Sequence, residues 1–433
     1  MSLMEKERET GLLEDFLRSA YDERASDSLK AIRSKAWDRF QLLGLPDQHN
    51  EVYRYIKRRE LYAANYKSAQ TIALTAEQIE PYVLPECAQS CLVFVNGLYQ
   101  PTLSRRDGIG AAPVILPLKD AIATYGTFLK SSWARTLKEE RDPFAAANAA
   151  VAEDGLFIYV PARSRVATPV QVLSIVHDAT GMMQFPRLLC FVGAQAEFQL
   201  YHTAQHLSGR AYAVNQVVDW TLDEAARVEY VSACFDEPED VWRLEATRAQ
   251  LKRDSYFRAI AVSKGTATHR HDYNVQLNGE NGDARLKGLW QLNGQRQMHS
   301  NVLIHHAAPH CSSMQLFKGV GYDATKSSFE GKIYVEPEAQ LTDAFQLNNN
   351  LLLGEGAQAY SKPNLEIFAD DVKASHGATI GQLDEDELFY LRTRGIAMDQ
   401  ARRMLVQGFV EEVIEKIPLD SLRQRILEWM CRG

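Results

Sequence analysis

The most regular pattern in the chain is a series of short apolar runs between residues 155 and 380. The runs are rich in β-branched and aromatic side chains, and glycine, asparagine, proline or aspartate separates them, as is typical of strands and turns. No amphipathic helical pattern of ordinary length intervenes, which disfavours a βαβ sheet and predicts a domain that is nearly all β. The clearest runs are residues 156–160, 170–176, 188–192, 197–201, 217–220, 228–231 and 365–368.

Helical patterns lie on both sides of this β region. Apolar residues recur at helical spacing from residue 4 to about 65, where Gly44 followed by Pro46 predicts the end of a helix. Residues 70–118 are mixed, and Asn96-Gly97 predicts a tight hairpin. Residues 119–150 return to helical composition.

The carboxy-terminal part begins a new helical pattern at Asp384. Asp384 and Glu387 fit a capping box, Gly395 ends the first helix, and Pro418 interrupts the second. The chain is thus predicted to have three parts: residues 1–118, an N-terminal mostly helical domain; residues 119–380, a β core with a helical lead-in; and residues 381–433, a C-terminal helical domain.

A small turn recurs inside the β region and bears on its architecture. Its occurrences are residues 193–196 (GAQA), 224–227 (EAAR), 338–341 (EAQL) and 356–359 (GAQA), and the last two begin 18 residues apart (338 and 356). Such weak periodicity is expected of the stacked turns of a parallel β-solenoid, while the residues alone leave a β-sandwich equally open. The terminal turn of a solenoid needs a cover, so the C-terminal helices are expected either to cap it or to dock another protein.

Composition and charge narrow the functional classes. The chain has 433 residues and a formal net charge of −8, which argues against a protein that binds the phosphate backbone of nucleic acid. Neither an apolar segment of about 18 residues nor a signal peptide is present, so no membrane association is expected and the cytoplasm is the predicted location. The six cysteines lack a repeating spacing and are expected to be free, buried thiols.

Few residues of the chain are candidates for chemistry. The sequence has neither a phosphate-binding loop nor a nucleophile elbow, so any ATP hydrolysis must take place on a partner protein. His269 and His271 alternate and should share one face of a strand, and residues 305–311 (HHAAPHC) place three histidines beside Cys311. For both groups, polar ladders are a better interpretation than a metal site, and Cys311 is a weak candidate ligand.

His376 is the stronger candidate. It follows a predicted strand, precedes a glycine, and lies close in sequence to Asp370 and Asp371, whose carboxylates are candidates to orient the imidazole or to join it as ligands. If no bulge intervenes, Asp370, Ala374 and His376 share one face of the strand. From these residues alone, a histidine that bonds the backbone remains the more common alternative.

Several segments of the chain, most of them in the last 120 residues or so, appear in the order found in one protein family. They are residues 36–40 (AWDRF), 43–46 (LGLP), 154–161 (DGLFIYVP), 317–319 (FKG), 331–337 (GKIYVEP), 342–344 (TDA), 370–373 (DDVK), 375–381 (SHGATIG) and 388–396 (LFYLRTRGI). On these segments the chain resembles the SufB/SufD family of iron–sulfur cluster assembly proteins, and the N-terminal segments resemble SufD-type members in particular. At position 374, where family members often carry cysteine, this chain has alanine, so no thiolate ligand is available there.

The resemblance implies a mainly β fold, with a right-handed parallel β-helix (solenoid) core between helical domains. It implies a non-enzymatic subunit of the SUF scaffold that pairs with a SufB-like chain through the β-helix edge, or with itself when it is alone. It also implies docking of a SufC-like ABC ATPase on the C-terminal helices, for which the candidate residues are Phe389, Leu405, Phe409 and Trp429.

No stably bound cofactor is expected, and iron or a nascent cluster would be held transiently at a partner interface to which His376 contributes. Two alternatives stay open. One is a SufB-like scaffold that binds the cluster itself, for which Cys311 is the remaining thiol. The other is a β-helix carbohydrate-active enzyme that uses Asp370 and Asp371 as acid and base.

Overall fold

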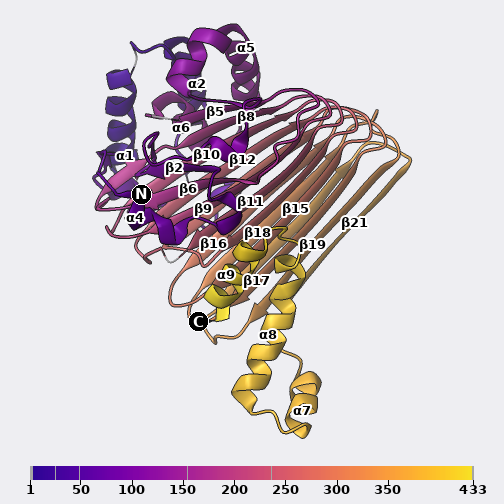
Figure 1. The fold of residues 1–433 in the computed structure, drawn as a ribbon. Helices are drawn as coiled ribbons and strands as arrows, with labels where there is room; N and C mark the ends of the chain where they lie inside the picture. The colour runs from indigo at the N-terminus through magenta and orange to yellow at the C-terminus, as the bar shows by residue number, and fades with distance from the viewer. Residues whose placement is uncertain (1–2, 25, 48, 154, 236, 432–433) are drawn as a thin grey trace.

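A computed structural model describes residues 3–24, 26–47, 49–153, 155–235 and 237–431. Residue 154, in the phrase 154–161, lies outside the described residues. Within this part of the chain, helices precede and follow a long stack of strands (Figure 1). The N-terminal helices are α1 (Leu3–Arg24), α2 (Lys30–Leu43), η1 (Glu51–Tyr53), α3 (Arg58–Ala63), α4 (Ala76–Ile79), η2 (Glu80–Tyr82), η3 (Pro85–Cys87), η4 (Asp107–Ile109), α5 (Leu118–Glu139) and α6 (Pro143–Val151), and the C-terminal ones are α7 (Glu385–Thr393), α8 (Met398–Ile414) and α9 (Asp420–Cys431).

The strands form two sheets that wind together as a β-solenoid of about eight turns. Pairs between strands from β5 onwards are parallel, and β10 to β19 each pair with the strands two before and two after them in sequence. This pairing confirms the solenoid and rules out the β-sandwich. The strands are β1 (Lys67–Ser68), β2 (Cys91–Val95), β3 (Leu98–Tyr99), β4 (Val114–Pro117), β5 (Gly155–Val160), β6 (Val170–Val176), β7 (Met182–Gln184), β8 (Arg187–Val192), β9 (Glu197–His206), β10 (Ala213–Leu222), β11 (Arg227–Phe235), β12 (Trp242–Leu251), β13 (Tyr256–Ser263), β14 (Thr268–Leu277), β15 (Asp283–Leu292), β16 (Gln297–His306), β17 (Ser312–Gly321), β18 (Lys326–Val335), β19 (Thr342–Leu352), β20 (Gln358–Ile367) and β21 (Val372–Gly381).

Three of the four recurring turns seen in the sequence, residues 193–196, 224–227 and 338–341, lie at one corner of the solenoid, where the chain passes from the eleven-stranded to the ten-stranded sheet. Residues 356–359 lie at the opposite corner, between β19 and β20, so the 18-residue spacing joins two different corners and is not the length of one turn. At the first corner, each connection from β5 to β19 has one residue in the left-handed region, including Gln195, Ala225 and Leu341, with φ of 58°, 55° and 60°. The backbone N–H of that residue donates to a carbonyl of the next turn, as in Gln195 to Glu224 (2.8 Å) and Ala225 to Arg253 (2.9 Å). These bonds satisfy corner backbone groups and hold successive turns in register.

Several local predictions at the ends are confirmed. Asn96 and Gly97 both have positive φ and join β2 to β3 as an antiparallel hairpin, while Gly44 ends α2 with φ of 64°. Asp384 caps α7 through bonds from the N–H groups of Asp386 and Glu387. The domain boundaries at 118 and 380 stay predictions, although β2 pairs with β6 and thus joins the solenoid sheet.

The C-terminal helices lie against the side of the solenoid, not across its last turn. Apolar residues of α8 and α9, including Val413, Ile414 and Ile426, pack on the outward-facing side chains Val231 and Phe235 of β11 and their neighbours. Helix α7 projects away from the body (Figure 1). The expectation that these helices cap the solenoid end is therefore wrong, because their apolar faces match the outer surface of the ten-stranded sheet. None of the helices in the described part of the chain is long and apolar enough to cross a lipid bilayer.

Candidate functional site

The last turn of the solenoid leaves two strand edges open. β20 is the terminal strand of the eleven-stranded sheet and β21 that of the ten-stranded sheet, and the two strands contact each other. β21 lies at the edge of the stack (Figure 1). Each edge therefore presents backbone N–H and C=O groups that no further strand of the described chain pairs. Such a double edge is a template for strand pairing with another chain.

His376 lies on this open end. It is exposed, and it pairs in register with Gln346 of β19, whose side chain is fully buried inside the solenoid. His376 is therefore on the inward side of β21, and the side chains of the preceding solenoid turn, including Gln346, lie next to it. Neither amide atom of Gln346 has a hydrogen-bond partner among the described residues, and the same holds for Gln315 one turn further in. These buried amides beneath His376 are available for a bound group.

Ala374 lies two residues before His376 on the same strand and packs against the apolar end of the core. Asp370 and Asp371 are exposed in the turn that precedes β21, where the backbone N–H of Asp371 donates to Oε1 of Gln340 at 2.9 Å. Across the described residues, no hydrogen bond or ion pair links either carboxylate to His376. Their supporting role stays a prediction.

Cys311 lies away from the open end. It immediately precedes β17, two strands in from β21, and is fully buried. Its thiol donates to the carbonyl of Gly279 at 3.3 Å, and burial raises its pKa. All five cysteines whose side chains are described are free and buried, as the sequence predicts.

The four docking candidates differ in exposure. Phe389 of α7 is 69% exposed, whereas Leu405 and Phe409 of α8 are half-buried. Phe409 packs beneath the ammonium of Lys318, which lies 4.4 Å from the ring centre. Trp429 of α9 is buried in an edge-to-face contact with Phe235, with ring centres 4.8 Å apart, so it holds α9 to the sheet. A free apolar surface thus lies on α7.

A polar cluster fills the interior in the middle of the solenoid. Oε2 of Glu245 on β12 lies 3.2 Å from Nε2 of His269 and 3.4 Å from Nδ1 of His271, both on β14. Across the interior, the Cys234 thiol of β11 donates to Oε1 of Glu245 at 3.7 Å. Arg243 donates to the same oxygen at 3.1 Å. All five side chains are buried.

Burial controls the protonation of this cluster. It raises the pKa of the Cys234 thiol and lowers the pKa of His271 to about 4, so at neutral pH the thiol is protonated and this imidazole is uncharged. The ligand atoms of Cys234, Glu245 and His269 all lie within 4.8 Å of one another, close enough to hold a metal ion.

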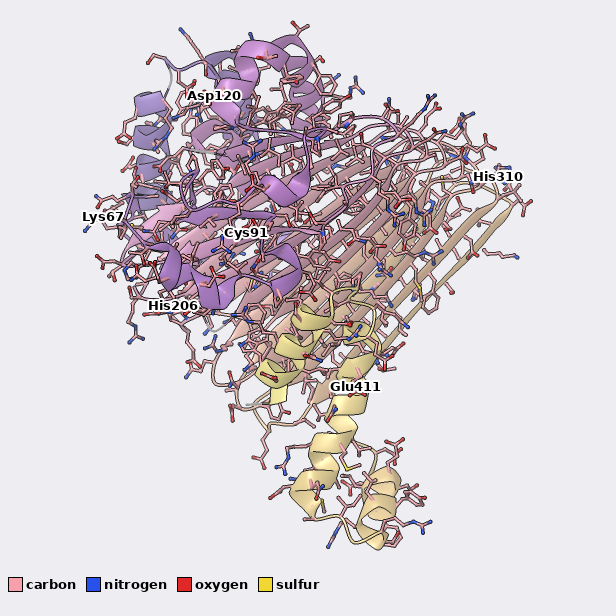
Figure 2. All side chains as sticks on the ribbon, in the orientation of Figure 1. Lys67, Cys91, Asp120, His206, His310 and Glu411 are labelled. Atoms are coloured by element: carbon pink, nitrogen blue, oxygen red, sulfur yellow. The ribbon has the colours of Figure 1, made fainter. Side chains whose placement is uncertain are left out.

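The sequence identifies only part of this cluster. Strand alternation correctly places His269 and His271 on one face, but nothing local singles out Cys234 or Glu245. The register that pairs Glu245 with His271, and the packing that brings β11 across the interior, decide their positions. The predicted histidine-rich segment 305–311 does not converge: His305 pairs with Glu336, His306 bonds Ser313, and His310 lies exposed at a corner (Figure 2).

Comparisons with known proteins agree with this architecture. Residues 10–172 match the profile of the SufBD protein N-terminal region, and residues 175–409 match the SufBD core domain of SUF system FeS cluster assembly. An iron–sulfur cluster assembly SufBD family protein of Synechocystis is 31% identical over 412 residues, which cover 92% of this chain and 90% of the relative. The iron–sulfur cluster assembly protein SufD of Escherichia coli is 28% identical over 407 residues, covering 89% and 88%. This chain therefore belongs to the SufBD family of SUF iron–sulfur cluster assembly proteins.

Proposed function

We propose that this chain is a SufD-like, non-catalytic subunit of the SUF scaffold. It pairs with a SufB-like chain through the open edges of β20 and β21, or with a second copy of itself when it is alone. The observation that carries the proposal is the double strand edge with exposed His376 on its inner side. Strand addition at such an edge supplies backbone hydrogen bonds, and alternate side chains supply specificity.

Iron or a nascent cluster is cargo in this proposal and is held transiently where the two chains meet. His376 supplies an imidazole ligand from this chain, and the partner supplies the sulfur ligands. The alternative of a SufB-like scaffold that binds the cluster itself has less support, because Ala374 offers no thiol and the thiol of Cys311 is buried two strands away from the edge. Family membership leaves the carbohydrate-active alternative without support.

Replacing His376 tests the ligand role. In His376→Ala, the complex with a SufB-like and a SufC-like protein of the same organism should still co-purify, because the backbone edge is unchanged. Cluster assembled on the complex should fall about tenfold or more, since loss of a group that holds the metal costs at least that much affinity. The measurement is iron and acid-labile sulfide per complex after anaerobic reconstitution.

The matched control is Ser375→Ala, which alters the adjacent exposed position on the opposite face of β21. It should assemble cluster at the level of the unmodified chain. Equal cluster content in all three proteins would contradict a role for His376, and failure of every protein to form the complex would contradict the edge-pairing proposal.

Phe389 tests the docking surface for the ABC ATPase. We expect Phe389→Ala to weaken binding of the SufC-like protein by about 2 kcal/mol, or roughly 30-fold, as for an exposed aromatic anchor. The pairing with the SufB-like chain should be unaffected. Leu42→Ala is the control, because Leu42 is 74% exposed on α2 of the N-terminal part. Titration calorimetry with each variant gives the result, and unchanged affinity for Phe389→Ala would place the docking surface elsewhere.

A further inference from the structure

The interior cluster combines three kinds of ligand atom that the scaffold function does not use. A thiol, a carboxylate and an imidazole converge from β11, β12 and β14, in the middle of the solenoid and away from the open end. We propose that Cys234, Glu245 and His269 bind one divalent transition-metal ion, Zn²⁺ or Fe²⁺, inside the solenoid. Thiolate and imidazole ligands favour these ions over Mg²⁺ and Ca²⁺, which prefer oxygen.

The spacing of the three groups already approximates a coordination shell. Bonds of about 2.0–2.3 Å in a tetrahedral site place the ligand atoms about 3.5 Å apart. Here Sγ of Cys234 lies 3.7 Å from Oε1 of Glu245, and Nε2 of His269 lies 3.2 Å from Oε2. These two contacts involve different oxygens of Glu245, and the ligand atoms of the three residues lie within 4.8 Å of one another, so the side chains must draw closer together when they bind one ion.

The imidazole of His269 is held in the orientation that a metal ligand needs. Its Nδ1 bonds the hydroxyl of Ser263 at 2.8 Å, which directs Nε2 towards Glu245. Metal-binding histidines commonly have the second ring nitrogen fixed in this way. Both ring nitrogens of His271 bond hydroxyl groups outside the proposed ligand set, those of Thr247 and Tyr273, so His271 is a neighbour and not a proposed ligand.

There is also space beside the cluster for one small group. A small closed cavity of about 10 Å³ adjoins the cluster, large enough for one water-sized sphere. Besides the three proposed ligands, its lining includes the polar residues Ser232, Ser263 and Ser300, and the rest of the lining is mainly apolar, including Leu289, Trp290 and Phe317. A three-residue site with one open position matches the coordination that zinc adopts when a water is the fourth ligand.

The charges balance when the ion is bound. A divalent ion with one thiolate and one carboxylate is neutral, and the Cys234 proton leaves for solvent as the sulfur–metal bond forms. The positive charge of Arg243 is balanced separately, because its Nε donates to the carboxylate of Glu237 at 2.7 Å. Burying this ion is therefore less costly than burying an unpaired charge.

Metal content of the purified full-length chain tests the proposal. The chain is produced in separate cultures supplemented with zinc or iron, purified without oxygen, dialysed against a weak chelator, and analysed by mass spectrometry for metals. We expect about one ion per chain, and a Co²⁺-substituted sample should show a thiolate-to-cobalt charge-transfer band. In Cys234→Ser, the metal content should fall about tenfold and the band should disappear.

Cys190→Ser is the matched control, because Cys190 is also buried in the solenoid core and outside the cluster. It should keep the metal and the band. Glu245→Gln, which keeps the side-chain shape, provides a second variant if Cys234→Ser does not fold, and it should also lose the metal. The proposal would be overturned if the unmodified chain from both cultures contained no metal, or if Cys234→Ser kept full metal occupancy. Comparing the two cultures distinguishes Zn²⁺ from Fe²⁺.

Discussion

Truncation after Gly395 is expected to lower the unfolding free energy of the solenoid, because it removes the helices that cover one of its faces. The truncation removes α8 and α9, which bury Val413, Ile414, Leu422 and Ile426 against the outer face of the ten-stranded sheet. Each such side chain contributes roughly 1.5–3 kcal/mol through burial. Their loss also exposes the sheet residues beneath them, so aggregation should follow.

Urea unfolding and size-exclusion chromatography measure this effect. The truncated chain should unfold at a much lower urea concentration than the full chain, or elute as aggregates. Phe389→Ala is the control, because this exposed side chain should change the unfolding free energy by about 0.5 kcal/mol at most. A monomeric truncated chain with unchanged stability would contradict the assigned packing. Failure of a truncated chain to bind an ATPase would thus not identify the docking surface, and point variants on α7 are needed.

Arg270→Ala is expected to destabilise the junction between the N-terminal helices and the solenoid by about 3–5 kcal/mol. Arg270 of β14 donates to Asp142 at 2.6 Å and to Asp272 at 2.7 Å, and its guanidinium lies 4.2 Å from the ring centre of Tyr53. All of these groups are buried. Removing the guanidinium leaves two carboxylates with less compensation in a medium that solvates charge poorly.

The loss of Arg270 should also destabilise the N-terminal helices, because its partner Asp142 caps one of them. Asp142 caps α6 through the N–H groups of Phe144 and Ala145, so disturbing its carboxylate weakens the start of that helix. The control is Arg253→Ala, whose partner Glu224 is exposed and whose ion pair should be worth at most about 1 kcal/mol. Urea unfolding of both variants makes the comparison, and equal losses would show that the buried network contributes no more than a surface pair.

The sequence by itself determined what depends on neighbours along the chain. Apolar runs, the recurring corner turn, the Asn96-Gly97 hairpin, the cap at Asp384 and the family motifs are all local, because strand alternation and helix capping involve residues only a few positions apart. The local patterns predicted the β core and the helical ends but left a β-sandwich as open as a solenoid, and the resemblance carried by the family motifs favoured the solenoid.

The tertiary structure alone decided which distant residues meet. Cys234 and Glu245 are 11 residues apart and His269 lies 24 residues beyond Glu245, so their convergence depends on inter-strand register and on packing across the interior. Likewise, the sequence shows that the C-terminal helices have apolar faces, but it does not show which surface those faces pack against. The C-terminal helices pack on the side of the sheet, so Trp429 is buried, Phe389 is exposed, and the edges of β20 and β21 stay open. The helical period of apolar residues predicts that one face of each helix is buried, but it does not predict which surface covers that face.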